Sequence, residues 1–78
     1  SHTALVWELA EEVADLILAG GELPSGVYAE VRLVSEEGVV EYSVGDPVQK
    51  PIATAYTYRL LENGTLVYVR VYAERLRG

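Results

Sequence analysis

The stretch AYTYRLLENGTLVYVRVY, residues 55–72, decides the fold, because one Asn-Gly pair separates two runs in which the character of the side chain changes at every second residue. Alternation at every second residue is typical of β-strands with one buried face. An Asn-Gly pair between two such runs is a strong signal for a two-residue hairpin turn. The stretch therefore predicts two antiparallel strands joined at Asn63-Gly64.

A two-residue turn at Asn63-Gly64 also predicts which side chains share a face. Tyr56 and Tyr58 are expected opposite valines, on the face that carries no charge and packs on the rest of the core. Tyr68 and Tyr72 are expected on the outer face, among the charged residues. This register divides the four tyrosines of the hairpin evenly between the two faces, which favours a structural role for them over a recognition surface.

Residues 3–19 predict an amphipathic helix that ends at Gly20-Gly21. Its main apolar stripe is formed by Leu5, Val6, Leu9, Val13, Leu16 and Ile17. Its acidic residues form a face expected to be solvated: Glu8, Glu11, Glu12 and Asp15. A further apolar flank makes the apolar arc wider than one sheet requires, and such a flank indicates a candidate interface with another subunit. The candidate interface consists of Trp7, Ala10, Ala14 and Leu18.

Residues 27–34 and 39–44 predict two more strands, because apolar and polar side chains alternate in both. A turn at residues 35–38 joins them, with a glycine at its last position. The expected register places Arg32 opposite Glu41, so that opposite charges meet across the hairpin.

Residues 45–51, GDPVQKP, contain two prolines and predict a wide loop or bulged corner between the second and third strands. The whole chain, residues 1–78, is therefore expected to be one α+β domain. Its N-terminal helix packs on the concave face of a curved four-stranded antiparallel meander, in the order α-β-β-β-β. Ser1-His2 reads as the remnant of a purification tag and is set aside.

The composition limits the function classes. The chain has no cysteine, so cysteine catalysis and thiolate metal sites are excluded. Its formal net charge is −6, which disfavours nucleic acid as a partner. No apolar run approaches the length of a membrane span. The only histidine, His2, has no neighbouring ligand residues, and we expect no metal, no cofactor and no enzymatic activity. The sequence does not indicate a cellular location.

A pocket between helix and sheet is the alternative to self-association. In the expected register, three tyrosine rings and a threonine converge on the helix-facing side of the sheet, where their hydroxyl groups could contact a small molecule. The candidate pocket residues are Tyr42, Thr54, Tyr56 and Tyr58.

The order of elements resembles the cystatin fold, in which a sheet wraps one helix. That family inhibits cysteine proteases through a first hairpin loop of the form Q-x-V-x-G, of which only Gln49 has a counterpart in the segment QKPIA, residues 49–53. The chain more closely resembles de novo designed curved-sheet proteins, in its turns VSEEGVV and LLENGTL and in its glycine-proline corner. This resemblance implies a scaffold without natural biochemical activity. With the wide apolar arc of the helix, it predicts a homodimer.

Overall fold

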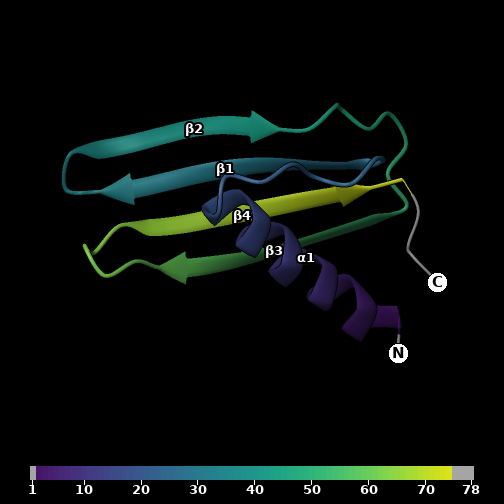
Figure 1. The fold of residues 1–78 in the computed structure, drawn as a ribbon, viewed down its shortest axis with the longest axis horizontal. Helices are drawn as coiled ribbons and strands as arrows, with labels where there is room; N and C mark the ends of the chain where they lie inside the picture. The colour runs from purple at the N-terminus through teal and green to yellow at the C-terminus, as the bar shows by residue number, and fades with distance from the viewer. Residues whose placement is uncertain (1, 75–78) are drawn as a thin grey trace.

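The structure, a computed structural model, describes residues 2–74, and the side chains of residues 8–74. It has one helix followed by four strands: α1 (His2–Leu18), β1 (Val27–Ser35), β2 (Gly38–Val44), β3 (Ala53–Leu60) and β4 (Leu66–Ala73). The strands form one antiparallel sheet, and α1 packs on one of its faces, across β3 and β4 (Figure 1). The predicted α+β fold with the order α-β-β-β-β is confirmed. His2, which was set aside, belongs to the helix.

The helix ends at the predicted pair of glycines. Gly20 has a φ of +75°, a left-handed conformation that glycine adopts without strain. The Gly21 amide donates to the Leu16 carbonyl at 2.8 Å, and the Gly20 amide donates to the Ile17 carbonyl at 3.1 Å. These two bonds form a Schellman motif, which satisfies the last carbonyl groups of the helix and turns the chain toward β1.

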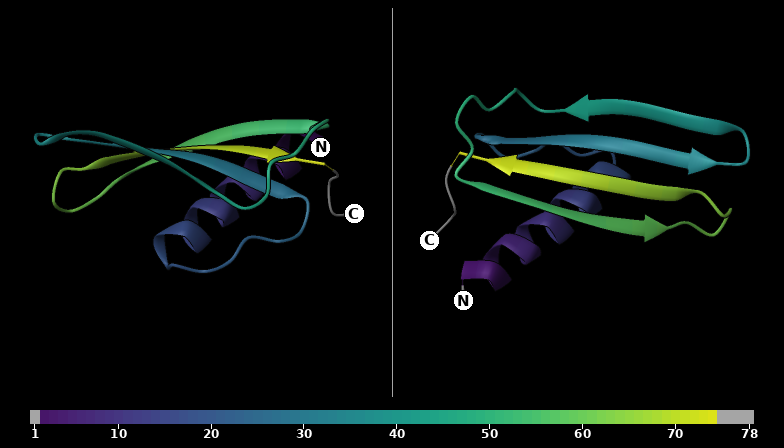
Figure 2. Two further views of the ribbon diagram at one scale, coloured as in Figure 1. Left: turned by 90° about the horizontal axis from the view of Figure 1, so that it is seen from above. Right: turned by 180° about the vertical axis from the view of Figure 1, so that it is seen from behind.

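The strand order is β2-β1-β4-β3, so the predicted meander is wrong. The most deeply buried strands, β1 and β4, lie side by side in the centre of the sheet. β2 and β3 are the two edges, and Figure 2 shows the twisted sheet with α1 on one side. Pairing β1 with β4 brings the two most regular apolar rows together, which a meander would separate.

Residues 45–52 cross from one edge of the sheet to the other, past the ends of β1 and β4 (Figure 1). Gly45 makes this path possible. A Cβ atom there would lie 2.6 Å from the Val27 carbonyl oxygen, and the φ of Gly45 is +89°. At the other end, the Ile52 amide donates to the Ala73 carbonyl at 2.9 Å, while Ala53 is the registered partner of Ala73. Two residues thus share one partner, as in a β-bulge.

The first hairpin has the predicted register. Arg32 lies opposite Glu41, and their side chains form an ion pair at 3.1 Å. Ser35 lies opposite Gly38, which leaves a two-residue turn.

The second hairpin is shifted by one residue from the predicted register. Leu60 lies opposite Leu66, because the loop contains three residues, 62–64, instead of two. The Gly64 amide donates to the Leu61 carbonyl at 3.0 Å, and the Leu61 amide donates to the Thr65 carbonyl at 2.9 Å. This pattern is a three-residue loop with glycine in its left-handed last position. Since side chains alternate along a strand, a shift of one residue moves every β3 side chain to the opposite face.

The core consists of small residues between α1 and the sheet. The fully buried apolar residues are Ala10, Val13, Ala14, Val27, Ala29, Val31, Val67, Val69, Val71 and Ala73. No buried polar side-chain atom within residues 8–74 lacks a hydrogen-bond partner. The helix therefore approaches the sheet closely, and the face of α1 toward the sheet is centred on Ala10, Val13 and Ala14.

Candidate functional site

The face of the sheet opposite α1 carries all four tyrosines of the second hairpin. The shifted register pairs Tyr58 with Tyr68 and places Tyr56 and Tyr72 on the same face. The Tyr58 and Tyr68 rings lie 6.4 Å apart between centroids, and those of Tyr28 and Tyr72 lie 5.9 Å apart. The predicted even division of the tyrosines is therefore wrong. They form one aromatic surface, which we call the open face.

The predicted pocket residues do not line a common cavity. Thr54, Tyr56 and Tyr58 point away from α1, because of the register of β3. Tyr42 lies on the other face, on the edge strand β2, and is 44% exposed. The side of the sheet toward α1 is filled instead by small residues of β3, among them Ala55 and the buried Thr57.

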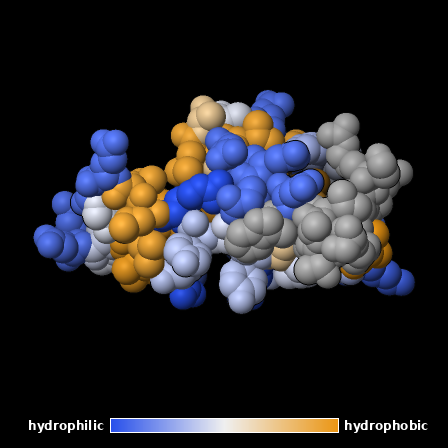
Figure 3. Space-filling view, turned by 90° about the horizontal axis from the view of Figure 1, so that it is seen from below, coloured by the Kyte–Doolittle hydropathy of each residue, from blue (hydrophilic) through white to orange (hydrophobic). Residues whose placement is uncertain are grey.

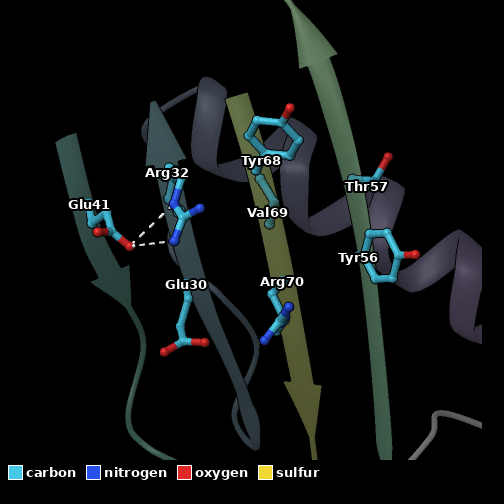
Figure 4. Close-up of a pocket in the computed structure, with 9 residues that line it drawn as sticks. Glu30, Arg32, Glu41, Tyr56, Thr57, Tyr68, Val69 and Arg70 are labelled. Atoms are coloured by element: carbon cyan, nitrogen blue, oxygen red, sulfur yellow. Dashed lines mark hydrogen bonds and ion pairs between the residues drawn. The ribbon is translucent and has the colours of Figure 1, made fainter. Parts of the chain in front are cut away.

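The open face contains a shallow hollow of about 320 Å³ (Figure 4). Its side chains come from all four strands and are Glu30, Arg32, Glu41, Tyr56, Tyr68 and Arg70. The Arg32 guanidinium donates to the Glu41 carboxylate at 3.1 and 3.3 Å. The Tyr72 hydroxyl donates to the Glu30 carboxylate at 2.8 Å. The two arginines and two glutamates balance each other, so the hollow carries no net charge.

Tyr72 also influences the neighbouring arginine. Hydrogen bonding to Tyr72 and electrostatic interaction with the same residue, followed by the charge of Glu30, raise the pKa of Arg70 above its ordinary value. The hollow offers cationic guanidinium groups and aromatic edges.

The predicted interface residues of α1 separate into buried and exposed positions. Ala10 and Ala14 are fully buried against the sheet of the same chain, so they cannot contact another subunit. Leu18 is 46% exposed, at the end of the helix. The side chain of Trp7 lies outside the described residues. The small residues of the predicted flank therefore belong to the core of the same chain, and of the described flank side chains Leu18 is the one that is exposed.

A polar network joins α1 to β3, and the sequence analysis missed it. The Thr57 hydroxyl donates to the Glu11 carboxylate, and Arg59 forms ion pairs with Glu11 at 3.1 Å and with Asp15 at 3.0 Å. Thr57 is 4% exposed, and Arg59 is mostly buried. Part of the acidic face is therefore paired with β3, while Glu8 and Glu12 are exposed as predicted. One feature of the sequence could have indicated this contact: the side chains of Ala53, Ala55 and Thr57 are small and leave room for a helix on that face of β3.

The open-face row of β3 is the most exposed apolar feature of the described residues. Tyr56 is 69% exposed, Tyr58 63% and Leu60 71%. Ile52, just before β3, is 63% exposed. Among residues 2–74, no strand pairs with the outer side of β3. Figure 3 shows the molecule from the side of the β3 edge, where orange residues gather toward one end and blue residues lie beside them. A free strand edge beside a row of apolar side chains is a common site of association.

The other free edge differs in charge. β2 has Glu41 at its centre, and Val39 and Val40 beside it are each 58% exposed. Charged side chains within an edge strand oppose pairing with another strand. The open-face row of β3 contains no charged residue, and this difference makes β3 the better candidate for contact with a partner.

Comparison of the chain with protein-family models, with curated proteins and with solved structures finds no match in any of the three. In the part of the chain that the structure describes, no helix is long and apolar enough to span a membrane. Within the same residues, no three acidic or histidine side chains lie together in a way that could hold a metal ion.

Proposed function

We propose that this chain is a structural domain that pairs with a second copy of itself, and that it performs no chemistry. The observation that carries this proposal is the exposed apolar row along a free edge strand, formed by Tyr56, Tyr58 and Leu60. Contiguous exposed apolar surface of this kind is unusual on a monomer and marks an interaction site. Tyrosine is also among the residues enriched in interfaces.

The distribution of charge supports a second copy as the partner. The chain has a net charge of −6, and two copies therefore repel each other at long range. The open face avoids this repulsion, because Glu30 and Glu41 are balanced there by Arg32 and Arg70. Acidic residues without a basic neighbour on the same face lie elsewhere, including Glu8 and Glu12 on α1, Glu36 and Glu37 in the first turn and Asp46 in the crossing connection.

Sedimentation equilibrium over a range from low to high micromolar concentration tests this function. We expect the mass to rise from the 8.6 kDa of one chain toward twice that value. Tyr58→Lys is expected to shift the curve toward the monomer, because a lysine on an edge strand opposes pairing. Val39→Lys, at an equally accessible position on β2, is the matched control and is expected to leave the association unchanged. A monomer at every concentration would refute the proposal.

The designed origin inferred from the turns stays a prediction, as does the absence of enzymatic activity. The resemblance to the cystatin fold carries no inhibitory function in this proposal. Gln49 is exposed in the connection between β2 and β3, but Pro51 and Ala53 stand where the family's loop motif has valine and glycine.

A further inference from the structure

We infer that two copies associate through their open faces, in one register that the side chains of this face determine. The two sheets pack face to face with their strands antiparallel, and the two helices lie on the outside. This inference rests on the proposed self-association and assigns its interface. Figure 2 shows α1 on one side of the sheet only, so open-face packing brings neither helix against the partner. A two-fold arrangement of this kind closes after two subunits.

The open face has the composition and the size of an interface. Tyrosine and arginine are enriched in interfaces, and this face carries two arginines and five of the six tyrosines of the chain. The five are Tyr28, Tyr56, Tyr58, Tyr68 and Tyr72. A face of four strands covers roughly 500 Å² at the usual strand spacing and rise per residue. Two such faces amount to about 1,000 Å², the lower limit for a specific interface.

Pairing of strand edges is less favourable than open-face packing. α1 lies mainly over β3, and Figure 1 shows that its first turns extend past the β3 edge. A second β3 on that edge would therefore bring two helices into the same space. The β2 edge has Glu41 at its centre, and a charged residue within an edge strand opposes pairing. The open face is clear of the helix, and its charges are balanced.

The side chains of the open face lie in rows that cross all four strands, because residues paired between neighbouring strands point to the same side of the sheet. The first central row contains Glu41, Arg32, Tyr68 and Tyr58. The second central row contains Ser43, Glu30, Arg70 and Tyr56. Figure 4 shows both rows side by side. Each strand thus contributes one residue to each row.

A two-fold axis between these two rows, perpendicular to the strands, makes the open face complementary to itself. The axis places the first row of each copy against the second row of the other, and each strand against the same strand of the partner. Arg32 then faces the partner's Glu30, and by symmetry this pair of opposite charges occurs twice. Tyr68 faces the partner's Arg70, so that the ring and the guanidinium group can form a cation–π contact.

The exposed row of β3 takes part in the same arrangement. Tyr58 faces the partner's Tyr56, so that the two most exposed rings of each copy cover those of the other. Aligned sheets cross at about 30°, so the central rows lie closest and the corners diverge. Val39 lies at such a corner, and the position that would face it is past Val44, the last residue of β2. A substitution of Val39 should therefore leave the interface intact.

This register also limits the cost of removing charges from water. Buried charges are costly unless they are paired. Glu41 lies on the edge strand β2, faces the partner's Ser43 and keeps its ion pair with Arg32. An axis parallel to the strands would instead set Glu41 against the partner's Tyr58, and Glu30 against the partner's Arg70. That register buries a carboxylate against a ring and separates the tyrosines of β3 from one another.

A pair of charge reversals tests the register, at two exposed positions of β1. Glu30→Arg places two positive charges face to face in its own dimer, and Arg32→Glu places two negative charges face to face. Each variant alone should dimerise on the order of a hundredfold more weakly than the unmodified chain, because facing like charges oppose association. An equimolar mixture of the two should form a heterodimer, in which every reversed residue faces an opposite charge again. Sedimentation equilibrium of each variant and of the mixture measures this.

Glu36→Arg is the matched control, because it changes the net charge as Glu30→Arg does but lies in the first turn, beyond the paired strands. It should dimerise at least as well as the unmodified chain, since the long-range repulsion is smaller. Weakening that the mixture does not reverse would overturn the register. If neither charge reversal weakened a dimer that sedimentation detects, the open-face interface would be overturned while self-association stayed intact.

NMR of the unmodified protein provides a readout that does not depend on any variant. In a mixture of isotope-labelled and unlabelled chains, nuclear Overhauser contacts between molecules should join the Tyr58 ring to the partner's Tyr56 ring. Contacts between molecules that involve Val40 or Tyr42, which point to the side of α1, would overturn the inference. A sample that stays monomeric at every concentration would refute both the proposed function and the interface.

Discussion

The two hairpins of this sheet are similar in length but lie in different environments. The β3–β4 hairpin lies under α1 and is joined to it through Arg59, which contacts Glu11 and Asp15. In the β1–β2 hairpin, the outer strand leaves Val40 and Tyr42 in contact with solvent, although both point to the side of the helix. One helix therefore covers only part of a four-stranded sheet, and the residues that attach the helix determine which part is covered.

The helix lies over β3 because the residues that face each other on α1 and on β3 are small. Ala10 and Ala14 of α1 are fully buried, and β3 offers Ala53, Ala55 and Thr57 on the facing row. Small side chains let backbones approach closely, which increases packing contacts. The corresponding row of β2 has the larger Val40 and Tyr42. A diagonal helix that contacts one hairpin closely cannot contact the other in the same way.

The two hairpins should differ most in the free energy of unfolding that is lost when a valine of each is truncated to alanine. Val69→Ala removes two methyl groups from the fully buried centre of β4 and should lower the free energy of unfolding by about 2 to 3 kcal/mol. Val40→Ala, on the uncovered row of β2, should change it by less than about 0.5 kcal/mol. Urea unfolding of both variants checks this. Comparable losses would mean that β2 is also covered in solution.

The polar network between α1 and β3 and the exposed ion pair of the β1–β2 hairpin should differ by a smaller amount in their contribution to stability. Glu11→Ala leaves the buried Thr57 hydroxyl without its acceptor and removes one ion pair of Arg59, so we expect a loss of about 1 to 2 kcal/mol. Glu41→Ala breaks the exposed ion pair with Arg32, and should cost less than about 0.5 kcal/mol. Thermal unfolding at low and at high salt measures both effects. If Glu41→Ala proved the more damaging of the two, the network would not be what holds the helix on β3.

Substitutions of the two turn glycines, Gly38 and Gly64, should also differ in their effect on stability. Gly38 has a φ of +129°, outside the left-handed helical region, whereas Gly64 has a φ of +88°, close to it. Asparagine enters the left-handed region more readily than other residues. Gly38→Asn should therefore cost about 1 to 2 kcal/mol, and Gly64→Asn about 0.5 kcal/mol. Neither position has an atom within 4 Å of an added Cβ, so the comparison measures backbone conformation alone. Urea unfolding of both variants measures the difference, and a larger loss for Gly64→Asn than for Gly38→Asn would contradict this expectation.

The two hairpins also differ in how well the sequence predicts them. In β1–β2, the turn and the pairing of Arg32 with Glu41 favour the same register, and this register is correct. In β3–β4, the Asn-Gly pair favours a two-residue turn, and the structure has a three-residue loop. The predicted register would direct Tyr56 and Tyr58 at the helix and remove Arg59 from Glu11. Packing against the helix outweighs the local preference of the turn, and no hairpin pattern contains that information.

The error in the register of the second hairpin also affected the prediction of the site residues. The exposed tyrosines of β3 were expected in the core, because the strand was assigned the wrong face. On the helix, Val13 of the predicted stripe is buried as expected, but Ala10 and Ala14, expected beside the stripe, are fully buried with it. The strand order was not predictable from adjacent turns, since β1 pairs with β4 across long sequence separation. The alternation in β1 and β4 could have indicated that both are central, because each has one fully apolar row.

The smallest effect is expected from shortening the second hairpin loop. Deleting Glu62 leaves Asn63-Gly64 alone between Leu61 and Thr65, whose backbone groups already form a hydrogen bond. The register of β3 against β4 is then unchanged, and the loop becomes the two-residue turn that Asn-Gly prefers. We expect a change in the free energy of unfolding within about 0.5 kcal/mol.

The first hairpin provides the control, because its turn is already at the minimum length. Deleting Glu36 leaves one residue between Ser35 and Gly38, so that this closing pair must open and Gly38 loses its place in the strand. The resulting loss of stability should be clearly larger than that of the Glu62 deletion, when both are measured by urea unfolding. If deleting Glu62 were the more harmful change, the three-residue loop itself, and not the packing of β3 under α1, would be holding the register.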